Sequence, residues 1–197
     1  MLMSILQQIL QWDRELFNKV NSDWSNSFFD AILPYMRNAM VWAPLYLFFI
    51  VFTIINYKRS GSFWVLFGVL AVATSDIISS WAIKELVFRV RPCHDETLAG
   101  HIHILVNYCP MSSSFTSSHA ANHFTLATFI FFTFRNHLNK WLWLVFLWAF
   151  IVAYAQVYVG VHYPGDIICG AFIGYFIGYT WAKTFTSGFL LTADQEK

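Results

Sequence analysis

The chain of 197 residues is 57% hydrophobic and 20% aromatic, with only 12% charged residues and a mean hydropathy of +0.51. Soluble domains carry about 25% charged residues, so this composition excludes an ordinary soluble domain and predicts a protein embedded in a bilayer. The formal net charge of +1 gives no basis for nucleic acid binding.

The N-terminal segment, residues 1–38, is predicted to lie on the membrane. It lacks a basic start, and its charged residues at 13–15 come too early for a cleavable signal peptide. Apolar residues recur at helical spacing between Leu2 and Val20, which favours an amphipathic helix in the interface. Residues 28–36 are apolar but contain Asp30 and Pro34, so they make a poor span; a sixth crossing within this segment is left open.

Five later stretches approach or reach the roughly 20 apolar residues that a bilayer requires. They are residues 40–57, 63–83, 118–135, 141–160 and 166–186. In the last stretch Gly170, Gly174 and Gly178 recur every four residues, a spacing that favours close helix packing within the bundle or between copies. The sequence therefore predicts one all-α domain over residues 1–197, a polytopic transmembrane helical bundle with five clear spans.

The basic residues of the short loops set the orientation. Five of them fall on one side of a five-span arrangement, which the positive-inside rule makes cytoplasmic: Lys58, Arg59, Arg135, Lys140 and Lys183. The loop of residues 84–117 then faces outward, on the periplasmic face of a cytoplasmic (inner) membrane. Its own cations violate the charge bias, which is explained if they bind a ligand.

Two cysteines, Cys93 and Cys109, lie in this outward loop. In an oxidising compartment they are predicted to form a disulfide. Two free thiols are the alternative. A zinc site with His94, His101 and His103 is disfavoured, because the spacing matches no standard ligand pattern.

Lys84 and Arg91 begin a series of three polar fragments at span ends. Seven residues separate them, about two helical turns, so they are predicted to share a helix face that Pro92 ends. An ammonium and a guanidinium on one face can hold a phosphate. The alternative is a pair of interfacial cations that reach toward lipid headgroups.

Ser117, Ser118 and His119 form the second fragment, directly before an apolar run. A serine is a good N-cap, and a helix N-terminus offers free N–H groups to a phosphate, beside the Ser117 hydroxyl and His119. Simple helix capping is the alternative. His119 and His123 are spaced as metal ligands on a helix, but with no nearby Glu a metal site is disfavoured.

The third fragment carries His162 and Asp166 just before the last span. Asp166 can accept the Nδ1 proton of His162, which leaves Nε2 free to attack phosphorus and form a phospho-histidine. His119 can then protonate the leaving oxygen. A capped loop with a structural histidine is the alternative.

Together the three fragments resemble the type-2 phosphatidic-acid phosphatase superfamily, whose pattern is Lys-x6-Arg-Pro, Pro-Ser-Gly-His and Ser-Arg-x5-His-x3-Asp. The resemblance runs from Lys84 to Asp166 and implies a helical bundle and phosphate hydrolysis without a metal or other cofactor. It also implies the residue roles: Lys84, Arg91, Ser117, Ser118 and Gln156 as the phosphate-binding positions, His162 as nucleophile, His119 as general acid and Asp166 as the partner of His162.

Two departures from this pattern stand out. Ser118 replaces the family's glycine, a mild change, because that position contributes mainly a backbone N–H. Ala155 and Gln156 replace Ser-Arg, whose arginine clasps the phosphate. Loss of one contact to the transition state costs on the order of 10²–10³ in rate. The chain is then slow or inactive, or Arg89 compensates, and Gln156→Arg is predicted to raise activity.

The leading functional hypothesis is a lipid phosphatase at the outer membrane face. Undecaprenyl diphosphate, phosphatidylglycerol phosphate and lipid A phosphates are competing substrates that no residue separates. The second hypothesis is a non-catalytic binder of phosphorylated lipid headgroups, favoured by Gln156. The partners predicted are the membrane and a phosphorylated lipid; the oligomeric state is not set by the sequence.

Overall fold

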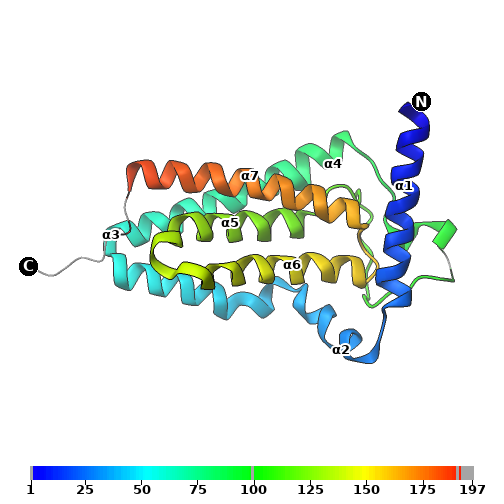
Figure 1. Ribbon diagram of the computed structural model, residues 1–197, viewed down its shortest axis with the longest axis horizontal. Helices are drawn as coiled ribbons and strands as arrows, with labels where there is room; N and C mark the ends of the chain where they lie inside the picture. The colour runs from blue at the N-terminus through cyan, green and yellow to red at the C-terminus, as the bar shows by residue number, and fades with distance from the viewer. Residues whose placement is uncertain (1, 99, 190, 192–197) are drawn as a thin grey trace, which may run out of the picture.

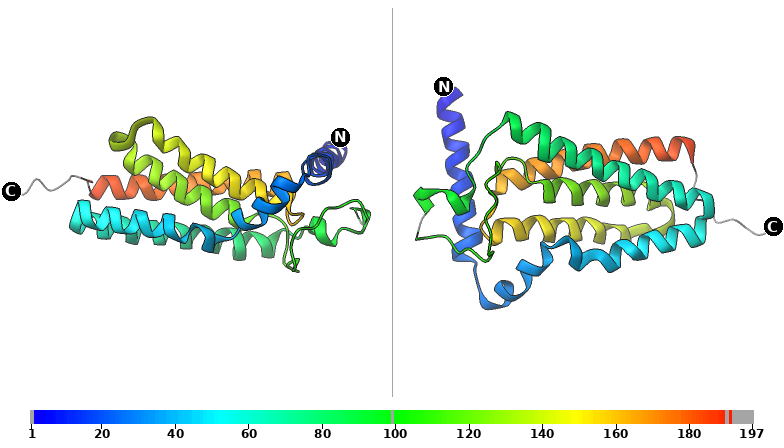
Figure 2. Two further views of the ribbon diagram at one scale, coloured as in Figure 1. Left: turned by 90° about the horizontal axis from the view of Figure 1, so that it is seen from below. Right: turned by 180° about the vertical axis from the view of Figure 1, so that it is seen from behind.

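Most of the long helices run side by side and build the body of the molecule (Figure 1). The computed structural model describes residues 2–98, 100–189 and 191, and within these ranges the regular structure is entirely helical. The predicted all-α class is confirmed. The first helix, α1 (Leu2–Asn18), lies across one end of the body instead of along it, as both views in Figure 2 also show.

The N-terminal segment folds as α1, a short π-helical turn (Lys19–Asp23) and α2 (Ser27–Met36). With 10 residues α2 has about half the length of a membrane span. Along α1 one face is apolar and open, with Met3, Leu6, Ile9 and Leu10 exposed, whereas Phe17 near its end is fully buried. The helix is therefore amphipathic, as its sequence pattern predicts.

Helix α3 (Ala43–Asp76) is folded back on itself at Lys58, where the backbone has a φ of 49°. Its two arms lie side by side (Figure 1). Gly61 permits the tight return, because a Cβ there would lie 2.0 Å from the carbonyl oxygen of Thr53. The predicted break between the first two apolar stretches is confirmed. The second arm continues through a π-helical segment (Ile77–Ala82) into α4 (Ile83–Leu86).

Two helical segments of the described chain are both long and apolar enough to be membrane spans by themselves. They are Ala39–Leu86, at a mean hydropathy of 2.0, and Lys140–Tyr158, at 1.7. The first has 48 residues and contains the doubled helix α3. The count of five spans stays a prediction.

Helix α5 (Ser118–Leu138) packs against α3, α6 (Trp143–Tyr158) and α7 (Pro164–Gly188). Its contact with α7 is the closest in the fold and runs along three glycines. A Cβ at Gly174 or Gly178 would lie 2.3 Å from a carbonyl oxygen of α5, and one at Gly170 would lie 2.6 Å from the carbonyl oxygen of Ser117, directly before α5. The glycine repeat thus packs within one chain, where small residues let two backbones approach closely.

Apolar clusters fix the two ends of the body. One, far from α1, gathers aromatic side chains of α3, α5 and α7 around Trp64, Phe134 and Phe185. Another joins the N-terminal segment to the end of α6 and the start of α7: Phe17, Val20 and Leu33 pack with Tyr158 and Tyr163. Hydrophobic burial therefore holds α1 and α2 against the end where the polar fragments lie.

The loop after α4 corrects one prediction. Lys84 and Arg91 do not share a helix face, because the helix ends at Leu86 and Val87 is extended, with φ −127° and ψ 103°. The Ser113 hydroxyl donates to the Val87 carbonyl at 2.8 Å and accepts the Arg89 N–H at 3.0 Å. These bonds replace helical ones. Pro92 also disfavours helical geometry at the residue before it.

Cys93 and Cys109 form a disulfide, with their Cα atoms 6.2 Å apart. The structure therefore contains the predicted bridge. Together with His94 these cysteines are the one group of three potential metal ligands among the described residues. Because their sulfur atoms are bonded to each other, they are not thiolates free to hold zinc.

Candidate active site

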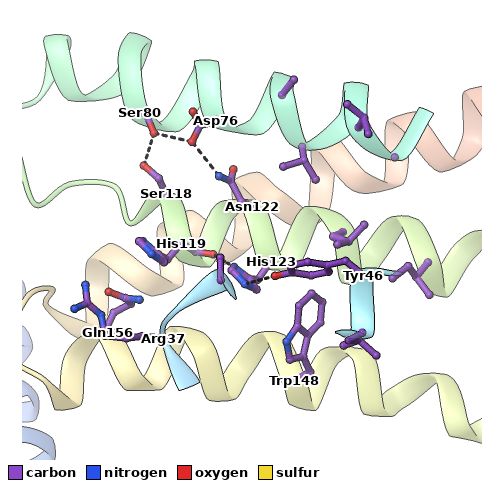
Figure 3. A pocket seen from close by; sticks show the side chains of 18 of the residues that line it. Arg37, Tyr46, Asp76, Ser80, Ser118, His119, Asn122, His123, Trp148 and Gln156 are labelled. Carbon is purple, nitrogen blue, oxygen red and sulfur yellow. Dashed lines mark hydrogen bonds between the residues drawn. The ribbon is translucent and has the colours of Figure 1, made fainter. Parts of the chain in front are cut away.

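A cavity of about 820 Å³ opens between α3, α5 and α6 at the end of the body that carries the loop of residues 84–117. Its polar end collects residues from all three fragments that the sequence singled out: Lys84, Arg91, Ser118, His119, Gln156 and His162. Figure 3 shows His119 and Gln156 on facing helices. Ser117 and Asp166 are fully buried and lie outside the cavity wall.

His162 owes its position to the way α6 ends. Gly160 has a φ of +87°, a left-handed geometry that glycine adopts without strain. The Gly160 N–H bonds the Val157 carbonyl at 3.0 Å, and the Val161 N–H bonds the Gln156 carbonyl at 3.1 Å. This pair of bonds is a Schellman motif. It turns the chain sharply, so that His162 and Gln156 face the same cavity.

The protonation state of His162 follows from its neighbours. Arg91 Nη1 lies 3.1 Å from His162 Nε2. Because a guanidinium only donates, Nε2 must be the unprotonated, accepting nitrogen. The proton is then on Nδ1, which lies 3.5 Å from the carboxylate of Asp166 and 3.5 Å from the Ser114 hydroxyl. The lone pair of Nε2 thus faces the guanidinium of Arg91 in the cavity wall.

Arg91 itself is buried and fixed by the loop. Its guanidinium donates to the carbonyl oxygens of Ser112, Ser113 and Val161, at 2.9, 3.2 and 3.1 Å. It also donates to the Ser112 hydroxyl at 3.1 Å. Arg91 therefore brings a positive charge to a defined place in the cavity wall, with its donors already engaged.

Asp166, in the first turn of α7, accepts several hydrogen bonds behind His162. The Tyr163 N–H donates to it at 2.9 Å, the Ser114 hydroxyl donates to the same oxygen, and Arg89 Nη1 donates to the other oxygen at 2.8 Å. A carboxylate held by so many donors stays ionised and in one orientation. It can keep the His162 ring oriented and stabilise the positive charge that the ring acquires.

Arg89 does not compensate for Gln156, contrary to one alternative drawn from the sequence. It is not among the residues that line the cavity. Its guanidinium joins Asp166 to Asp13 of α1, at 2.8 and 2.6 Å, and lies 4.0 Å from the centre of the Tyr163 ring. Two carboxylates and an aromatic face engage this charge on the side of Asp166 away from the cavity.

The carboxylate of Asp13 also accepts the N–H of Gly165 at 2.6 Å. Asp13 and Ser114 both support the site, and sequence reasoning missed them. Ser114 stands in a run of three serines, a weak signal. Nothing in the sequence around Asp13 indicates that it reaches the start of α7, more than 150 positions away.

On the opposite wall, α5 presents His119 toward the cavity. The next histidine on this face, His123, has both ring nitrogens engaged, by the His119 carbonyl at 2.8 Å and the Tyr46 hydroxyl at 3.2 Å.

The Ser117 hydroxyl accepts the Ala120 N–H at 3.4 Å, so it caps the helix, and its contact with phosphate stays a prediction. Ser118 accepts a bond from Ser80 at 2.7 Å (Figure 3).

Gln156 lies in the cavity wall with its amide unsatisfied. The side chain is fully buried, and neither its nitrogen nor its oxygen has a hydrogen-bond partner in the structure. Buried polar atoms normally have partners, and each exception calls for an explanation. A ligand oxygen in the cavity would supply one.

Burial lowers the pKa of His162 to about 4, although Asp166 acts in the opposite direction. The folded protein then binds fewer protons than the unfolded chain between about pH 6.5 and pH 4. Stability is therefore fully present above this window and lost as the pH falls through it. We expect the Tm of the wild type to fall between pH 7 and pH 5, by about 2–4 °C for each kcal/mol of unfolding free energy that is lost. Thermal unfolding of the purified protein in detergent measures it.

His162→Asn is the matched control for this titration, because it removes one titrating group and leaves the other buried histidines. Its Tm should fall less over the same pH range. Equal slopes for the two proteins would mean that the pKa of His162 is not depressed by folding.

The N-terminal helix gives a second expectation. Asp13→Asn removes one charge from the link between α1, Arg89 and Asp166, and a hydrogen bond to a charged group contributes about 1.5–3 kcal/mol. We expect phosphatase turnover to fall roughly tenfold, because Asp166 is held less firmly. The measurement is phosphate release in detergent. Glu15→Gln, in the same helix and bonded only to Gln11, is the control and should behave as wild type. Equal rates for both variants would contradict a positioning role.

Comparison with known proteins gives this arrangement its family. The family model described as the PAP2 superfamily matches residues 64–188, which is more than half of the chain. The chain belongs to the PAP2 superfamily. The match begins in the second arm of α3 and ends with α7, so it contains all three polar fragments and leaves α1 and α2 outside.

Two relatives of this PAP2 protein are named as lipid phosphatases. It is 31% identical over 166 residues to a lipid A 4'-phosphatase of Bacteroides thetaiotaomicron, with 83% of this chain and 71% of the relative covered. It is 25% identical over 186 residues to an undecaprenyl-diphosphatase of Sulfolobus acidocaldarius, covering 92% and 82%.

A solved structure supports the fold. The crystal structure of a transmembrane PAP2 type phosphatidylglycerolphosphate phosphatase from Bacillus subtilis superimposes with a TM-score of 0.70 at 22% identity, and the match covers 92% of this PAP2 protein and 87% of that chain. The two proteins therefore share a transmembrane fold. The predicted family is confirmed, and the names of these relatives support the general expectation of a membrane lipid phosphatase.

Proposed function

We propose that this PAP2 protein hydrolyses the phosphate of a membrane lipid through a phospho-histidine at His162. The observation that carries the proposal is the state of His162: Nε2 is unprotonated and 3.1 Å from a guanidinium, and Asp166 lies behind Nδ1. Nε2 attacks phosphorus, the bond from phosphorus to the lipid oxygen breaks, and His119 gives its proton to that oxygen.

The second half of the reaction regenerates the site. Water attacks the phosphorus of the phospho-histidine, His119 takes a proton from that water, and inorganic phosphate leaves as the bond to Nε2 breaks. Asp166 stabilises the positive charge on the His162 ring while the phosphoryl group is attached. The charges of Lys84 and Arg91 stabilise the transferring group.

The apolar part of the cavity supports a lipid as the substrate. Away from the histidines the wall is formed by both arms of α3 and by α5, through Phe49, Trp64, Val69, Val72, Leu126 and Ile130. Such a surface accepts a hydrocarbon chain while the polar end holds the phosphate. A lipid A phosphate is the first substrate to test, given the relative that is 31% identical, and undecaprenyl diphosphate is the second.

We further propose that the site faces outward from the cytoplasmic membrane, with α1 in the interface. The basic residues Lys58 and Arg59 lie at the return of α3, at the end of the body opposite the cavity mouth and α1, as Figure 1 allows the reader to follow. By the positive-inside rule that end is cytoplasmic. The test is labelling with an impermeant thiol reagent in intact cells. Labelling of Arg59→Cys but not of Thr97→Cys would show that the protein has the opposite orientation.

The test of the function is phosphate release from a panel of lipids in detergent: a lipid A phosphate, undecaprenyl diphosphate and phosphatidylglycerol phosphate. The wild type should release phosphate from at least one, and His162→Asn from none. Gln156 is the observation that favours a second candidate, a binder of phosphorylated headgroups that does not hydrolyse them. Saturable binding of these lipids without release by the wild type would support that alternative.

A further inference from the structure

A second arginine reaches the polar end of the cavity from outside the region that matches the family. Arg37 directly follows α2 and lines the cavity together with Gln156. Figure 3 shows the two side chains next to each other, at the same end as His119. The Nε atom of Arg37 and both polar atoms of the Gln156 amide are buried without a partner. Three polar atoms in one corner of the cavity therefore lack partners.

The fold holds Arg37 in this corner through contacts between the N-terminal segment and α6. The Tyr158 hydroxyl, near the C-terminal end of α6, donates to Asp30 of α2 at 2.7 Å and accepts the Asn26 N–H at 3.0 Å. On the other side, Trp42 donates to the Met36 carbonyl at 2.7 Å and packs against Trp148 of α6, with ring centres 5.9 Å apart. Arg37 lies between these two attachments.

Within the part of the chain that the structure describes, the charge of Arg37 has no counter-ion. Burial lowers the pKa of Arg37. Burial also lowers the pKa of Arg91, and the like charge of Arg37 lowers it further. Buried like charges are unfavourable unless an anion compensates them.

The lining of the cavity contains three fixed cations and one carboxylate. The cations are Arg37, Lys84 and Arg91, and the carboxylate is Asp76, which already accepts bonds from Ser80 and Asn122 at 3.0 and 2.9 Å. The imbalance fits a ligand with about two negative charges, as a phosphate monoester carries near neutral pH.

We propose that Arg37 is a phosphate-binding residue, and that its guanidinium and the Gln156 amide donate to the phosphate group positioned for attack by His162. The assignment rests on the proposed function, which it deepens. A guanidinium offers a planar fork that matches phosphate oxygens, and its charge counts most in a site shielded from water. In this protein the cation comes from the residue that follows α2, while α6 supplies only the neutral amide.

The experiment moves the cation from one position to the other. Phosphate release from the lipid that the wild type hydrolyses best is measured for Arg37→Gln, Gln156→Arg and the double variant. Arg37→Gln should lower kcat/KM about 10²-fold. The double variant, with the guanidinium on α6, should have a kcat/KM at least tenfold higher than that of Arg37→Gln. Gln156→Arg alone is the reference for the double variant: the gain that it gives should be smaller in the wild type than in the Arg37→Gln background, because the wild-type site already holds a cation. Arg59→Gln, at the return of α3, is the control and should match the wild type.

A second readout does not depend on turnover. Inorganic phosphate is titrated calorimetrically into each purified protein in detergent, and the Kd should rise about tenfold in Arg37→Gln and recover in the double variant. If that pattern appears while the wild type hydrolyses no lipid, the proposed function is wrong and Arg37 still binds phosphate.

Two results would overturn the assignment of Arg37. One is an active wild type with Arg37→Gln within threefold of it. The other is a large loss in Arg37→Gln, at an unchanged Tm, that Gln156→Arg does not relieve. In that case Arg37 acts from its own position on something other than the phosphate.

Discussion

Replacing His162 with Asn is expected to abolish turnover, with kcat lower by about 10⁴-fold or more. The amide of Asn can still donate toward Asp166, so the buried network behind the site is largely kept, but no atom remains to attack phosphorus. His119 and the cations then bind a substrate that they cannot cleave. The measurement is phosphate release from the best lipid of the panel, followed long enough to detect one turnover.

The control for this variant is His101→Asn, which changes an exposed histidine in the loop of residues 84–117 and should turn over like the wild type. The Tm of His162→Asn above pH 7 should stay within a few degrees of the wild type, which separates lost chemistry from lost folding. Retention of more than about 1% of the wild-type rate would sink the phospho-histidine mechanism, since nucleophile removal costs far more than that.

Gly174→Ala is expected to have the second largest effect, on assembly and then on activity. A Cβ at this position would lie 2.3 Å from the Ala121 carbonyl oxygen and 2.9 Å from the Thr125 nitrogen, and neither backbone atom can move without shifting α5. Overpacking of this kind costs about 1–3 kcal/mol. Because α5 carries His119 and α7 begins beside His162, separation of the two helices also widens the site.

Gly188→Ala is the matched control, because it makes the same change in the same helix at a place where a Cβ meets nothing within 4 Å. It should leave the Tm unchanged or raise it slightly, since alanine favours a helix more than glycine does. Thermal unfolding and phosphate release are measured on both. Equal Tm values for the two variants would mean that the α5–α7 contact can open at little cost.

The parts of the fold that were predictable are those with a local cause. The return of α3 could be read from the basic and small residues at 58–61, since charged residues leave the bilayer and a glycine permits a tight approach. The glycine repeat of α7 could be read from its spacing. Helices α5, α6 and α7 begin within about two residues of the predicted starts, because Ser117 and Pro164 are strong signals of a helix N-terminus.

What the sequence did not reveal depends on contacts between distant segments. Helix α4 ends early because the Ser113 hydroxyl bonds the Val87 carbonyl and the Arg89 N–H. No feature of residues 84–91 predicts this early end. Asp13 reaches the start of α7, and Arg37 reaches the cavity, only because the N-terminal segment folds over the end of the bundle. A single charged residue in an amphipathic segment looks the same whether it faces water or a partner 150 residues away.

The close backbone contact between α5 and α7 has a consequence for how the lipid preference of the protein can change. His119 belongs to α5, Asp166 lies in the first turn of α7 and His162 lies just before that helix, so these groups form one stiff unit held by backbone contact. The wall that faces the hydrocarbon comes largely from α3, whose second arm meets that unit through side chains such as Trp64 and Phe129. Contacts between side chains tolerate substitution far better than close contacts between helix backbones do. Exchanging residues 43–76 between relatives is therefore a route to a new lipid preference that leaves the reacting groups where they are.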